Sequence, residues 1–62
     1  MKLYIKEINR IKTIFGEYNI TYYLLNENYS VLESCVSSSP EWAEHDLLRG
    51  HDEWKDVEIE FL

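Results

Sequence analysis

Hydrophobic and acidic residues alternate strictly near the C-terminal end of the chain. Val57, Ile59 and Phe61 are apolar, and each is preceded by a carboxylate. Successive side chains of a β-strand point to opposite faces, so this pattern predicts a half-buried strand with one apolar and one acidic face. The acidic face would carry Asp56, Glu58 and Glu60.

A second alternating region surrounds Gly16-Glu17 and predicts a β-hairpin. Glycine at the first central position of a two-residue turn can adopt the positive φ of a type II′ turn, which would pair Phe15 with Tyr18. This register collects one apolar face, made of Ile11, Phe15, Tyr18, Ile20, Tyr22 and Leu24. Its coherence on both strands is the main argument for the hairpin.

The segment 2–14 has two interpretations. As a strand, Leu3 and Ile5 extend the apolar face, and Glu7 and Asn9 interrupt it at a bend or a β-bulge. As a helix, the segment would use the apolar residues that recur at helical spacing and end before Gly16. The helical set is Tyr4, Ile8, Ile11 and Phe15.

Asn26-Glu27-Asn28 predicts a second turn, after which a strand runs from Tyr29 to Val36. A three-residue loop with Asn28 in the left-handed region would place Leu32 and Val36 on the apolar face. A two-residue loop would place Val31 and Cys35 there instead. The sequence leaves both registers open.

The serine-rich segment 37–41 predicts the start of a helix that runs to about Arg49 and stops at Gly50. The helix cap is Ser38, with Glu41 three residues on, or Ser39, with proline at the first helical position. At 100° per residue, one side of the helix faces the sheet and carries Pro40, Ala43 and Leu47, flanked by Leu48. The opposite side carries Trp42, His45 and Arg49.

Together these elements predict a single small α+β domain spanning residues 1–62. Its antiparallel sheet would have three to four strands in the chain order β-β-β-α-β, with one helix packed on one face. The only cysteine, Cys35, excludes an intrachain disulfide and is expected to pack as a small apolar residue in a reducing cytoplasm. No apolar run approaches the length of a membrane span, and no signal-peptide pattern opens the chain.

Charge is distributed unevenly along the chain, whose formal net charge is −6. The first fifteen residues carry four cationic side chains and one acid, a net of +3, and the rest carries eleven acids and two cations, a net of −9. Such an acidic surface opposes direct binding of nucleic acid or of anionic membrane and favours a basic protein partner.

The candidate partner-binding residues lie in the second half of the chain. Trp42, His45 and Arg49 would form a ridge on the outer side of the helix, and Trp and Arg are enriched among binding hot spots. The carboxylates and the second tryptophan expected to join this ridge are Glu41, Glu44, Asp52, Glu53, Asp56, Glu58, Glu60 and Trp54. Structural roles are the alternatives: Trp42 could cover the end of the core, and the acidic strand could be an edge charged against aggregation.

The spacing of carboxylates along the acidic strand can be compared with the spacing of phosphates in nucleic acid. Alternate strand residues lie about 6.6 Å apart, against about 3.4 Å between phosphates along one DNA strand. Mimicry of nucleic acid would therefore need the carboxylates of the helix as well. Tyr22, Tyr23 and Tyr29 form a possible base-stacking platform, but the acidic remainder of the molecule would repel a nucleic-acid strand.

Catalytic and metal-binding patterns are not found in the sequence. There is no glycine-rich phosphate loop and no nucleophile-elbow motif. The dipeptides His45-Asp46 and His51-Asp52 match no metal-ligand spacing. We therefore expect a protein that is not an enzyme and needs no cofactor.

The working hypothesis is a cytoplasmic protein that inhibits or regulates a basic partner, such as a nuclease or another nucleic-acid-binding protein. In size, charge and architecture, though in no motif, the chain resembles small acidic phage proteins that block bacterial defence nucleases, anti-CRISPR proteins among them. That resemblance implies a viral inhibitor acting in the host cytoplasm; immunity proteins and antitoxins share the same profile. The alternative is a homo-oligomeric structural or accessory protein that uses its sheet edge or helix face as the interface.

Overall fold

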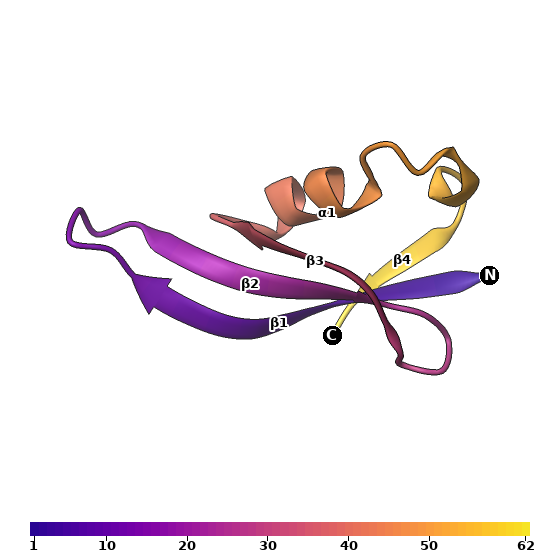
Figure 1. Cartoon of the computed structure of the whole chain (residues 1–62), viewed down its shortest axis with the longest axis horizontal. Helices are drawn as coiled ribbons and strands as arrows, with labels where there is room; N and C mark the ends of the chain where they lie inside the picture. Colours follow the sequence, from indigo (N-terminus) through magenta and orange to yellow (C-terminus); the bar gives the residue numbers. More distant parts are fainter.

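Four strands form one sheet, and a single α-helix covers one of its faces, in the computed structural model, which describes all of residues 1–62 (Figure 1). In chain order the elements are β1 (Lys2–Lys12), β2 (Tyr18–Leu25), β3 (Val31–Ser37), α1 (Pro40–Leu48), the 3-10 helix η1 (Asp52–Trp54) and β4 (Glu58–Phe61). The α+β class, the element order and the helix on one face are confirmed, and the N-terminal segment is a strand.

The strands lie in the order β3-β2-β1-β4, and the last pair makes the sheet mixed rather than purely antiparallel. β4 runs parallel to β1, with Leu3 opposite Ile59. Parallel strands need a long crossover connection, and the segment holding α1 and η1 supplies it. The alternation of residues predicted β4 itself, but strand direction depends on this crossover, which strand periodicity does not report.

The first hairpin turns through residues 13–17, so the predicted two-residue turn is wrong. Thr13 closes this loop: its N–H donates to the carbonyl oxygen of Glu17 at 2.7 Å, and its hydroxyl accepts the N–H groups of Phe15 and Glu17 at 3.3 and 3.2 Å. Gly16 has the expected positive φ, at +83°. The threonine side chain stabilises a longer loop in place of the predicted turn that paired Phe15 with Tyr18.

The longer loop shifts the register of β1 against β2. Ile11 lies opposite Asn19 and is exposed, as is Phe15, so both predicted core positions are wrong. A β-bulge lies between Glu7 and Asn9, where the predicted alternation breaks. The bulge changes which face the later residues of β1 occupy, because side chains alternate with a period of two.

The second hairpin also differs in detail from its prediction. Tyr29, rather than Asn28, takes the left-handed conformation, at φ +62°. The side-chain oxygen of Asn26 accepts the N–H groups of Asn28 and Ser30 at 2.8 and 3.0 Å. Cys35 faces the helix, half-buried and packed against the core, as the shorter loop alternative predicted. Val31, which that alternative placed on the same face, is 53% exposed on the other face, and the connection spans residues 26–30, so neither predicted loop is correct.

The core lies between α1 and the face of the sheet that α1 covers, here called the inner face. It contains seven buried residues: Leu3, Ile5, Ile20, Tyr22, Leu24, Ala43 and Leu47. Ala43 and Leu47 confirm the predicted side of the helix, whereas Pro40 is exposed. Ser39 caps the helix, since its hydroxyl accepts the N–H of Trp42 at 3.4 Å.

One polar atom of the core has no partner. The hydroxyl of Tyr22 is buried without a hydrogen bond, and leaving such a group unsatisfied costs about 1–3 kcal/mol. Tyr22→Phe keeps the ring and removes the hydroxyl, so we expect the free energy of unfolding to rise by about 1 kcal/mol. Urea unfolding followed by circular dichroism measures this, with Tyr18→Phe on the exposed part of β2 as the neutral control.

The same substitution should alter the response to alkaline pH. Burial raises the pKa of the Tyr22 phenol. The folded protein therefore keeps this proton to a higher pH than the unfolded chain, and the free energy of unfolding falls as the pH rises above about 10. Tyr22→Phe should reduce this fall. An unchanged alkaline profile would contradict the burial of the phenol. Burial also raises the pKa of Cys35, so part of the fall should remain.

Candidate acidic interface

The outer side of α1 carries the predicted aromatic ridge. Trp42 is 60% exposed, and its indole meets the imidazole of His45 edge-on, with ring centroids 6.0 Å apart. Arg49 lies on the same side but donates to the carboxylate of Asp46 at 2.8 Å. The structure thus brings Trp42 and His45 together, while Arg49 neutralises an acid of its own helix.

Several carboxylates in the second half of the chain have no ion-pair partner. Three acids of this region form ion pairs: Asp46 with Arg49, Glu53 with His51, and Glu60 with Lys2 at 3.1 Å. The acids of the second half of the chain that form no ion pair are Glu41, Glu44, Asp52, Asp56 and Glu58. Most of the negative charge from residue 41 onward is therefore uncompensated by the basic N-terminal segment.

The predicted row of three strand carboxylates is shorter than expected. β4 begins at Glu58, and Asp56 lies in the turn before it. Glu58 and Glu60 project from alternate positions of β4, and Lys2 of the adjacent strand binds the second of them. The strand therefore offers one free carboxylate rather than a row of three.

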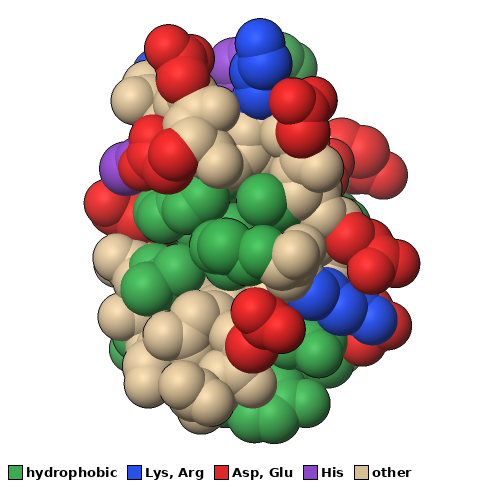
Figure 2. Space-filling view, turned by 90° about the vertical axis from the view of Figure 1, so that its right-hand side faces the viewer, with side chains coloured by type: hydrophobic (Ala, Val, Ile, Leu, Met, Phe, Trp, Pro, Cys, Tyr) green, Lys and Arg blue, Asp and Glu red, His purple; other side chains and the backbone are tan.

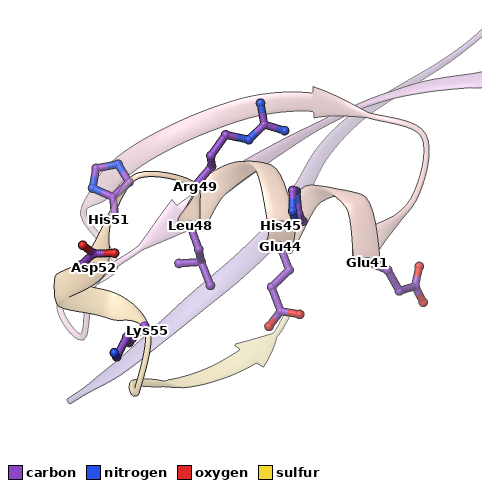
Figure 3. A pocket seen from close by; sticks show the side chains of 8 residues that line it. All are labelled: Glu41, Glu44, His45, Leu48, Arg49, His51, Asp52 and Lys55. Carbon is purple, nitrogen blue, oxygen red and sulfur yellow. The ribbon is translucent and has the colours of Figure 1, made fainter.

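A shallow groove of about 460 Å³ lies between α1 and η1 (Figure 3). Of the eight residues that line it, only Leu48 is hydrophobic; the others are Glu41, Glu44, His45, Arg49, His51, Asp52 and Lys55. Leu48 and Glu44 project to one side of the helix and Arg49 to the other. Seven of the eight lining side chains are polar or charged and the groove is open, so its surface is suited to charged contacts.

His51 joins η1 to the sheet, a role that sequence reasoning missed. Its ring stacks on Trp54 with centroids 4.1 Å apart, and its nitrogens lie 3.1 Å from Glu53 and 3.4 Å from Glu33 of β3. The hydrogen bond from its own backbone and then that from His51 lower the pKa of Glu53. Trp54 packs against the core, so this predicted contact residue has a structural role. The contact between His51 and Glu33 joins residues far apart in the sequence, so the role of His51 could not be found from local patterns.

No group of three or more His, Cys, Asp or Glu side chains is arranged to hold a metal ion. None of the helices is both long enough and apolar enough to span a membrane.

The end of the molecule at the right of Figure 1 shows how acidic and hydrophobic side chains are combined (Figure 2). Hydrophobic side chains gather near the middle of this end, and acidic side chains surround them on several sides. Few lysine or arginine side chains interrupt them. We call the exposed residues of α1, η1 and the turn before β4 the acidic surface; its free carboxylates are Glu41, Glu44, Asp52 and Asp56.

Comparison of the chain with protein-family models, with curated proteins and with solved structures finds no match.

Proposed function

We propose that this protein is a small, non-enzymatic inhibitor or regulator of a basic partner that itself handles nucleic acid. The observation that carries the proposal is the exposed indole of Trp42 on the same helix as the unpaired carboxylates of Glu41 and Glu44, which line one groove with Asp52. A surface potential of one sign steers an oppositely charged partner into contact. A large exposed aromatic side chain then supplies contact area that the partner can desolvate.

The proposed mode of action is occlusion. The partner's basic functional surface, which would otherwise contact phosphates, is covered by carboxylates held on α1 and before β4. The free carboxylates of Glu41 and Glu44 lie on one helix, three residues apart, and are neighbours on its surface. No chemical step and no cofactor is part of the proposal. A phage-encoded inhibitor of a defence nuclease in the host cytoplasm, an immunity protein and an antitoxin all fit this mode.

A pair of matched charge variants tests the proposal. Glu41→Gln with Glu44→Gln removes two free carboxylates from the acidic surface. Glu17→Gln with Glu27→Gln removes two from loops of the hairpins, so both variants change the net charge from −6 to −4. Only the first should slow association with the partner, by about tenfold at low salt, because steering depends on charge near the interface.

The measurement has two stages. The immobilised protein is exposed to a lysate of its source cells, the retained basic protein is identified, and rates are then measured with that purified protein by surface plasmon resonance. Association should slow as ionic strength rises towards physiological values. Trp42→Ala should mainly speed dissociation. Equal slowing in both charge variants, or retention of no basic protein, would refute the proposal.

A further inference from the structure

The face of the sheet opposite α1 is uncovered. Figure 1 shows α1 and η1 together on one side of the sheet and no helix on the other, which we call the outer face. A groove of about 500 Å³ runs over it, and six of its seven lining residues are hydrophobic. The lining residues are Lys6, Ile8, Tyr23, Leu25, Tyr29, Val31 and Leu62.

Local structure explains why apolar residues gather on this face. Tyr23 and Leu25 alternate with the core residues of β2 and so point away from the helix. Ile8 sits at the β-bulge and lines the groove beside them. Tyr29, in its left-handed conformation, packs against Tyr4 with ring centroids 5.0 Å apart.

The exposed apolar area approaches what a protein interface needs. The half-exposed large hydrophobic residues of this face are Ile8 (44%), Ile11 (59%), Tyr29 (60%), Val31 (53%), Val36 (62%) and Leu62 (55%). Summed over the face, where the polar residues Asn19 and Thr21 lie between some of them, they present roughly 600 Å², comparable to the largest apolar patch on a typical monomer. With the half-buried tyrosines and Lys6 between them, the face approaches the ~800 Å² that each partner buries in a standard interface.

The charges of the outer face indicate which kind of partner can bind to it. The charged side chains of the outer face are Lys2, Lys6, Glu58 and Glu60. Lys2 binds Glu60, which leaves one free cation, Lys6, and one free anion, Glu58. The face is therefore neutral as a whole, whereas the helix side carries the excess negative charge. Two copies of a chain with net charge −6 therefore repel each other less when they meet through this face than when they meet through the acidic helix side.

We propose that the outer face is the interface of a homodimer in which two sheets pack face to face. The two faces would lie about 10 Å apart with their apolar side chains interdigitated. Lys6 and Glu58 have opposite signs, so a two-fold arrangement can bring each near its counterpart on the partner. Both copies of α1 then face outward, and the dimer presents two acidic surfaces. This inference does not depend on the proposed function.

Sedimentation equilibrium and light scattering over about 1–500 μM test the dimer, since a weak self-association is populated by mass action. The apparent mass should rise from 7.5 kDa towards twice that value. Ile8→Lys and Val31→Lys, at exposed positions of β1 and β3, should each weaken dimerisation at least tenfold while circular dichroism stays unchanged. Trp42→Lys, the same change of a large exposed apolar residue on the helix side, should leave it intact.

The variants also distinguish the competing modes of association. Val31 lies on the edge strand β3, and Ile8 lies on the part of β1 that β4 does not cover. Loss of the dimer in Val31→Lys alone would assign it to pairing of β3 edges, and loss in Ile8→Lys alone would assign it to pairing along β1; either result would overturn the proposal. Loss in Trp42→Lys alone would assign it to the helix side. A monomer throughout the concentration range would also overturn the proposal. In the proposed dimer both tryptophans stay outside the interface, so their fluorescence should not change as the dimer forms.

Discussion

Leu24→Ala is expected to leave much of the protein unfolded in buffer. Leu24 is fully buried near the end of β2, between β1 and β3, in the core cluster that also holds Ala43 and Leu47 of α1. Replacing a buried leucine by alanine costs about 2.7–5 kcal/mol, because transfer energy is lost and a cavity remains. A domain of this size, without disulfide or metal, has only a few kcal/mol of stability. The predicted loss is therefore comparable to the total.

Circular dichroism in urea measures the effect, with Ile14→Ala as the matched control. Ile14 is 94% exposed at the tip of the first hairpin, so its truncation should change the free energy of unfolding by less than about 0.5 kcal/mol. A loss below about 1 kcal/mol in Leu24→Ala would mean that Leu24 does not sit in a close-packed core.

Ala43→Leu should destabilise the protein by about 1–3 kcal/mol, through crowding instead of a cavity. Ala43 is fully buried between α1 and the sheet, and its carbonyl oxygen lies 4.0 Å from the sulfur of Cys35 on β3. The helix backbone is thus close to the strand, and a leucine there must push the two apart. The helix has only one other fully buried anchor, Leu47, so its position should be sensitive to this change.

His45→Leu is the control, because it places the same side chain on the exposed side of the same helix. We expect it to be close to neutral in urea unfolding. Near-ultraviolet circular dichroism and the reactivity of Cys35 towards a thiol reagent report helix displacement directly. If Ala43→Leu is as stable as the native chain and Cys35 stays protected, the contact between α1 and β3 is looser than described.

The parts of the fold that were predictable are those specified by short-range patterns. Alternation identified β4, and the serine-proline segment identified the start of α1, with Ser39 as one of its two candidate caps. The side of α1 that carries Ala43 and Leu47 followed from helical geometry. Each of these depends on neighbours within a few residues, so one sequence contains the necessary information.

The register of the first hairpin was not predictable, because it depends on the hydrogen bonds of one side chain in the loop. The hydroxyl of Thr13 accepts two hydrogen bonds within the loop, and the longer loop that results leaves Ile11 and Phe15 outside the core. The direction of β4 depends on the crossover through α1 and η1. In the candidate interface, exposure of Trp42 agreed with helical geometry, whereas burial of Trp54 follows from long-range packing.

The first hairpin extends well beyond the helix, to the left in Figure 1. Residues 13–17 at its tip hydrogen-bond mainly among themselves, and Ile14 and Phe15 there are 94% and 85% exposed. Nothing in the core rests on this tip. Exposed loop tips of this kind tolerate added sequence, so an affinity tag or a fluorescent reporter could be grafted there. The graft would stand clear of α1, so partner binding by the acidic surface could be followed on a labelled protein. Ile11 of the outer face lies two residues from this loop, so self-association is better measured on the unlabelled chain.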